Sequence, residues 1–162
     1  MDVNFILALC VAFLGIFIGF VLAIYTKEEL KDGKKYFLFL QKFLLSLMFF
    51  LLLYIFNLQF IINLFLSLIF FVLLLYKGSP NQQIVYALIA ILFSISSCKS
   101  SVFPMMGTLV FLYGLPTGTL LTHGMIKKKK SEIIFNLFKI IIWLPVVAII
   151  LFYLNFFTTI LC

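Results

Sequence analysis

The sequence predicts an all-α integral membrane protein, a polytopic bundle of six transmembrane helices with both termini outside. Hydrophobic residues make up 65% of the 162 residues and charged residues only 10%, whereas a soluble domain carries roughly 25% charged residues. The apolar residues come in blocks close to the roughly 20 residues that cross a bilayer as a helix. These blocks lack the polar and apolar alternation of membrane β-strands.

Six apolar blocks fill the chain and leave no room for a separate soluble domain, so residues 1–162 are predicted to form one transmembrane domain. The fourth block is short and fades into a serine-rich stretch. A bundle of five full spans with a short or re-entrant fourth segment is therefore the alternative. The predicted spans are 3–25, 36–56, 60–76, 81–97, 102–126 and 131–155.

The first span carries a stripe of small residues at intervals of 4, 3, 4 and 4. At 100° per residue these intervals keep the stripe on one helix face. Small residues let two helix backbones approach closely in lipid. The stripe is predicted to pack against another helix of this chain, a membrane-protein partner or a second copy. Its members are Ala8, Ala12, Gly15, Gly19 and Ala23.

Residues 26–35 (TKEELKDGKK) connect the first two spans. Thr26 and Glu29 have the spacing of a capping box, and Gly33 suits the end of a helix, so a short interfacial turn is predicted. Its lysines are either solvated or bound to anionic lipid headgroups. The second and third spans, rich in Leu and Phe, are predicted to be a lipid-facing scaffold.

Lysines predict the orientation of the spans. The connections after spans one, three and five carry four, one and four lysines, whereas only Lys99 lies on the other side. Lysine-rich connections stay in the cytoplasm, which places both termini outside. Tyr25, Tyr36, Tyr76 and Tyr86 are all predicted at the cytoplasmic interface, where tyrosine is enriched.

All twelve basic residues are lysine, and Phe, Ile and Asn are abundant. This composition is typical of an AT-rich genome, and it predicts a multi-pass protein of a prokaryotic plasma membrane. The net charge is +7, and most lysines sit at the ends of the apolar blocks. Their position indicates the lipid bilayer and its anionic headgroups as the partner rather than nucleic acid.

The stretch 94–124 breaks the apolar pattern with serines, glycines, threonines and two prolines. One face of the fifth span carries Gly107, Gly114, Gly118 and Thr122. Pro116 lies between two of these glycines and is predicted to kink or break the helix, with nearby threonine hydroxyls satisfying the freed backbone. Broken helices expose backbone to substrates in small transporters. A kinked, closely packed helix without a ligand is the alternative.

One face of the sixth span carries Asn136, Lys139 and Trp143. These residues are predicted to line a cavity that opens to the cytoplasm, or else Lys139 reaches the membrane interface. His123 precedes the KKKK run by one turn and is predicted to be interfacial, with a gate or ligand role as the alternative. The predicted path or packing site is Gly107, Gly114, Pro116, Thr117, Gly118, Thr119, Thr122, His123, Asn136, Lys139 and Trp143.

Catalytic signatures are missing from the sequence. No carboxylate lies inside a predicted span, and neither HExxH nor Gly-x-Ser occurs. The three cysteines, Cys10, Cys98 and Cys162, have neither paired nor metal-ligand spacing. No catalytic, metal or cofactor residue is predicted, and an enzyme is disfavoured. Two functions remain: a structural or accessory protein that packs through small-residue faces, and a carrier or channel for a small solute or ion along the fifth and sixth spans.

Overall fold

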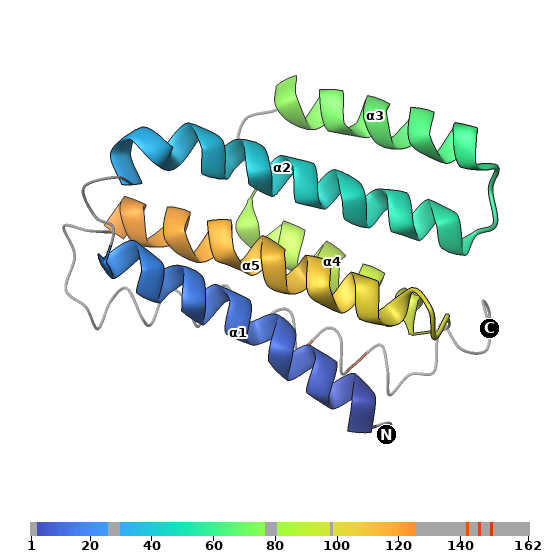
Figure 1. Cartoon of the computed structure of the whole chain (residues 1–162), viewed down its shortest axis with the longest axis horizontal. Coiled ribbons are helices and arrows are strands. Elements are labelled where there is room, and N and C mark those ends of the chain that lie inside the picture. The colour runs from blue at the N-terminus through green and yellow to red at the C-terminus, as the bar shows by residue number, and fades with distance from the viewer. Residues whose placement is uncertain are drawn as a thin grey trace.

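The computed structural model describes residues 3–25, 30–76, 81–97 and 99–125, together with Ile142, Val146 and Ile150. Within these residues the chain is all-helical. Successive helices run in opposite directions (Figure 1). The helices are α1 (Val3–Tyr25), α2 (Leu30–Ile55), α3 (Phe60–Tyr76), α4 (Gln82–Ser96) and α5 (Phe103–Met125).

Four helices form a row in the order α1, α5, α2 and α3, and α4 packs against both α2 and α5. Two helical stretches of the described chain, Gly33–Ile55 and Phe103–Thr122, have the length and apolar composition to cross a membrane. Helix α4 has 15 residues, or about 22 Å at 1.5 Å per residue, which is shorter than a hydrocarbon core of about 30 Å. The predicted sixth span, 131–155, lies outside the described residues except for three positions.

Helix α2 differs from its prediction in two respects. It begins at Leu30, so Gly33 lies inside the helix, and the predicted stop there is wrong. It also packs in the core on one side, because Gln41, Leu44 and Met48 are buried, although large apolar side chains on its other sides are exposed. The sequence does not show this buried face, because between Phe43 and Ile55 apolar residues lie on every side of the helix.

Helix α3 is the outermost helix of the row, and most of its apolar surface is exposed. Its single buried residue is Asn63, whereas Ile61 is 78% exposed and Phe65 66% exposed. The Asn63 amide donates a hydrogen bond to the Leu58 carbonyl at 3.3 Å. A helix that buries an amide and exposes leucine and phenylalanine has the polarity that suits hydrocarbon, the reverse of a helix in water.

The two connections at the ends opposite the lysine-rich loops are tied together by Lys99. Its ammonium donates to Asn57 Oδ1 at 2.8 Å and lies 5.4 Å from the centre of the Tyr54 ring. Asn57 has a φ of 57°, a left-handed conformation that asparagine tolerates. The serines before Lys99 hydrogen-bond to their own helix. For example, Ser94 Oγ donates to the Ala90 carbonyl at 3.0 Å. This end of the bundle is therefore held by side chains.

Candidate functional site on helix α5

Helix α5 meets α1 through glycine, with backbone against backbone. A Cβ added to Gly15 would overlap the carbonyl oxygen of Phe111, and one added to Gly19 would overlap that of Leu115. Both pairs are separated by the same number of residues, so α1 and α5 run parallel and in register. Because the obstructing atoms are backbone, a methyl group at either glycine cannot be accommodated by side-chain rotation.

The glycines of α5 make the reciprocal contact. A Cβ on Gly114 would lie 2.8 Å from the backbone nitrogen of Ile16, and one on Gly118 would lie 2.8 Å from that of Phe20. The Gly-x-x-x-Gly motifs of the two helices therefore interlock. Interlocking of this kind gives van der Waals contact in lipid, where the hydrophobic effect does not drive association.

The small-residue stripe of α1 is consequently occupied by the same chain. Ala12 and Ala23 are 2% and 0% exposed, and Gly15 and Gly19 are buried too. The Ala8 side chain lies outside the described residues. This face is not available to a second protein in this conformation, which removes the reason for expecting a partner or a second copy there.

The opposite side of α5 carries a buried polar cluster, which consists of Gln41, Gln82, Tyr86, Tyr113 and Thr117. Gln41 Nε2 donates to Thr117 Oγ1 at 2.9 Å and to Gln82 Oε1 at 3.2 Å. Thr117 in turn donates to the Tyr113 carbonyl at 2.8 Å. One glutamine amide thus joins α2, α4 and α5.

Two members of this polar cluster, Tyr86 of α4 and Tyr113 of α5, pack against each other. The Tyr86 and Tyr113 rings meet edge to face with centroids 6.0 Å apart, and the side chains are 0% and 1% exposed. The Tyr86 hydroxyl has no hydrogen-bond partner among the described residues. Tyr86 was expected at the membrane interface; the structure buries its ring between helices, and its depth in the membrane stays a prediction. Tyr25, Tyr36 and Tyr76 are all exposed.

Pro116 lies inside α5 without interrupting it, so of the predicted kink or break the break does not occur, and the kink stays a prediction. The threonine hydroxyls were expected to satisfy the backbone freed by the proline, which is the Leu112 carbonyl. Thr119 instead donates to the Pro116 carbonyl at 2.8 Å and Thr122 to the Gly118 carbonyl at 2.7 Å. These threonines therefore bond to carbonyls within their own turn of helix.

The structure brings together only part of the predicted path. Gly107, Gly114, Pro116, Thr117, Gly118, Thr119 and Thr122 all lie buried in α5. The backbone of His123 belongs to the last turn of α5, and its side chain lies outside the described residues. Asn136, Lys139 and Trp143 also lie outside them. The contribution of the sixth predicted span to this site therefore stays a prediction.

Sequence reasoning missed four members of the polar cluster: Gln41, Gln82, Tyr86 and Tyr113. A glutamine near the start of an apolar span was the available signal for Gln41, because a buried amide needs a hydrogen-bond partner on a neighbouring helix. No comparable signal marks the tyrosines, since tyrosine is common at membrane interfaces. Only the packing of α4 against α5 identifies them as buried.

The site is polar and uncharged. Every buried polar side chain of the described residues is an amide or hydroxyl, and no group of three or more potential metal ligands occurs among these residues. Amides and hydroxyls can hydrogen-bond a neutral polar group but supply no general base or nucleophile of raised reactivity. Comparisons with protein-family models, curated proteins and solved structures give no match.

Proposed function

We propose that the protein is a multi-pass integral protein of a prokaryotic plasma membrane, with six spans and outside termini, and that its role is structural or accessory. The exposed apolar surface of α3 carries the membrane part of this proposal. Leu and Phe side chains cover that helix and only Asn63 is buried. Exposing such a surface to water would cost about 25 cal/mol per Å², whereas acyl chains cover it at no such cost.

Support for a structural or accessory role comes from α5, which has partners on two sides. The backbone of α1 occupies the space beside its glycines, and Thr117 accepts a hydrogen bond from Gln41 of α2. A helix fixed in this way suits a rigid scaffold better than a moving gate. A partner protein would have to bind the exposed faces of the bundle, such as the outer face of α1 at Leu14 and Ile18.

Membrane topology is tested with single cysteines in a chain whose native cysteines are replaced by serine. An impermeant maleimide should label Ser100→Cys on intact cells and Ser79→Cys only after permeabilisation. Resistance of the protein to carbonate extraction is expected as well. Release by carbonate would exclude membrane insertion, and the opposite labelling pattern would exclude the proposed orientation.

The accessory role is tested separately with a photo-crosslinking amino acid at Leu14 or Ile18. An accessory protein should give a discrete adduct with one membrane protein in intact cells. The matched control places the crosslinker at Ala23, which is 0% exposed, and it should give no such adduct. Crosslinks to lipid alone from every exposed face would contradict the accessory role and leave the membrane proposal intact.

A carrier or channel for a small solute or ion is the second candidate, and the polar cluster favours it. The hydrogen-bonded run from Gln82 through Gln41 to Thr117 leads from the half-buried start of α4 toward the unpartnered Tyr86 hydroxyl. Proteoliposomes should then admit glycerol or a monovalent ion faster than empty liposomes. Gln41→Leu should abolish the difference, and equal rates for wild-type and empty liposomes would exclude transport of those solutes.

A further inference from the structure

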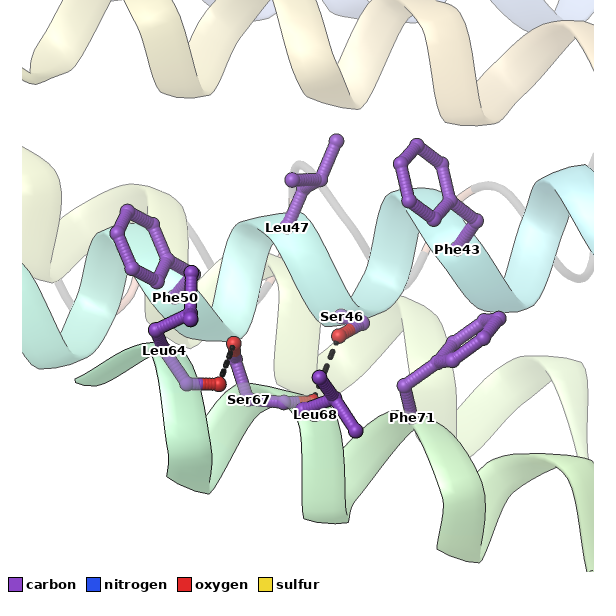
Figure 2. Close-up of a pocket in the computed structure, with 8 residues that line it drawn as sticks. All are labelled: Phe43, Ser46, Leu47, Phe50, Leu64, Ser67, Leu68 and Phe71. Atoms are coloured by element: carbon purple, nitrogen blue, oxygen red, sulfur yellow. Dashed lines mark hydrogen bonds between the residues drawn. The ribbon is translucent and has the colours of Figure 1, made fainter. Parts of the chain in front are cut away.

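An open groove of about 300 Å³ runs between α2 and α3. It is lined by four residues from each helix, and Figure 2 shows the serines Ser46 and Ser67 between the helices with Phe50 and Phe71 toward the two ends. The α2 residues of the lining extend from Phe43 to Phe50, or about 10 Å along the helix. Because α3 is the last helix of the row and α2 is its neighbour, the groove lies at one end of the row.

The polar atoms of the groove are already engaged. Ser46 Oγ donates to the Ser67 carbonyl at 2.9 Å, and Ser67 Oγ donates to the Leu64 carbonyl at 2.9 Å. The rest of the lining is phenylalanine and leucine. With both hydroxyl protons used inside the protein, the groove presents an apolar surface and favours an apolar occupant.

A protein helix fits this groove poorly. Membrane helices approach each other through glycine, alanine and other small residues, as α1 and α5 do here. Helix α3 contains neither glycine nor alanine, and its one small residue, Ser67, already faces α2. A flexible chain of methylene groups needs no small-residue face.

Positive charge lies at one end of the groove. Lys42 directly precedes Phe43, and its ammonium reaches the Leu75 carbonyl in the last turn of α3 at 3.5 Å. Lys35 lies two helical turns before Lys42, on the same side of α2, and is exposed. The exposed rings of Tyr36 and Tyr76 mark the same end, as aromatic residues do at a membrane interface.

Helix α2 contains four lysines and a single acid, Asp32. Each lysine near an anionic lipid surface contributes about 1 kcal/mol to binding. A phosphate at the level of Lys35 and Lys42 would place its acyl chain in line with the groove. The charge is complementary to an anionic headgroup, and the groove is complementary to a chain.

We propose that the α2–α3 groove is a binding site for an anionic phospholipid, with one acyl chain between Phe43 and Phe50 and the headgroup phosphate at Lys35 and Lys42. The site is independent of the polar cluster on α5 and of any accessory role. It requires a membrane-inserted bundle, so the topology labelling described above separates a failure of membrane insertion from a failure of this site.

The test is native mass spectrometry of the purified full chain with phosphatidylglycerol or phosphatidylcholine added to the detergent. Lys35→Gln and Lys42→Gln should each weaken phosphatidylglycerol binding about five-fold, the equivalent of 1 kcal/mol, and leave phosphatidylcholine binding unchanged. Lys34→Gln is the matched control, because Lys34 is also exposed and lies about 100° around the helix from Lys35.

A second pair of variants tests the groove itself. Leu68→Trp fills the groove from an exposed position and should abolish tight binding of phosphatidylglycerol. Leu73→Trp adds the same ring to an exposed α3 position outside the groove and should bind as wild type. The proposal is overturned if Leu68→Trp binds normally, if Lys34→Gln weakens binding as much as Lys35→Gln does, or if both lipids bind equally well.

Discussion

Helices α1 and α3 lie at opposite ends of the row α1–α5–α2–α3, and they are attached to it in opposite ways. Helix α1 brings glycine against the backbone of α5, so the two main chains are in contact. Helix α3 meets α2 through aromatic rings, with Phe39 and Phe71 edge to face at 5.6 Å and Phe49 stacked on Phe70 at 4.5 Å. Helices α1 and α5 approach closely because glycines at their contact have no side chains. Helices α3 and α2 are separated by large aromatic side chains.

The two joints differ in whether lipid can replace the contact between the helices. Acyl chains are as apolar as leucine, so phenylalanine and leucine surfaces lose little when lipid covers them. A backbone groove over glycine fits another backbone more closely than it fits lipid. Helix α1 is therefore expected to be held tightly in the bundle, while α3 borders lipid and leaves an open groove beside it.

The α1–α5 joint should break with the smallest substitution. Gly15→Ala is expected to lower the free energy of unfolding by about 1–3 kcal/mol, because the new methyl overlaps the backbone of Phe111 and forces the helices apart. Denaturation in mixed micelles, followed by circular dichroism, measures this loss.

The matched control is Gly33→Ala in α2, where the new Cβ meets only the flexible Phe37 ring at 3.2 Å. Alanine is a better helix former than glycine, so this variant should gain about 0.5–1 kcal/mol. The same change would then have opposite signs at the two sites. Equal effects at both would show that the backbone contact between α1 and α5 does not form.

The middle joint, between α5 and α2, depends on one amide. Gln41→Leu keeps the volume but removes the hydrogen bonds to Gln82 and Thr117, and it should cost about 1–2 kcal/mol at the strength of interhelical hydrogen bonds in membranes. Gln59→Leu, at an exposed position, should stay within about 0.5 kcal/mol. The same denaturation measures both, and a loss with Gln59→Leu equal to that with Gln41→Leu would argue against the bridge.

The sequence predicts where the helices of this row lie in the chain better than it predicts which helix packs against which. Helical class and the two small-residue faces follow from composition and spacing, because apolar runs and glycine intervals are local properties. The partner of a face is not local: the stripe of α1 fits a second copy as well as it fits α5. In the second half of α2 apolar residues lie on every face, so no periodicity indicates that Met48 points inward. Of the kink or break predicted at Pro116, only the break is excluded, because neighbouring packing can hold a proline-containing helix in one piece.

The outer joint, between α2 and α3, should show the smallest effect and a local one. Ser46→Ala removes the hydrogen bond from Ser46 to the Ser67 carbonyl, and its cost is expected to be about 0.6 kcal/mol. Ser67→Ala removes a bond within α3 only, so it should leave the joint between the helices unchanged. Hydrogen exchange resolves the two, because Ser46→Ala should speed exchange of α3 amides while those of α1 and α5 keep their protection. Faster exchange throughout the bundle would mean that α3 opens together with α1 and α5, and the contrast between the two ends of the row would be lost.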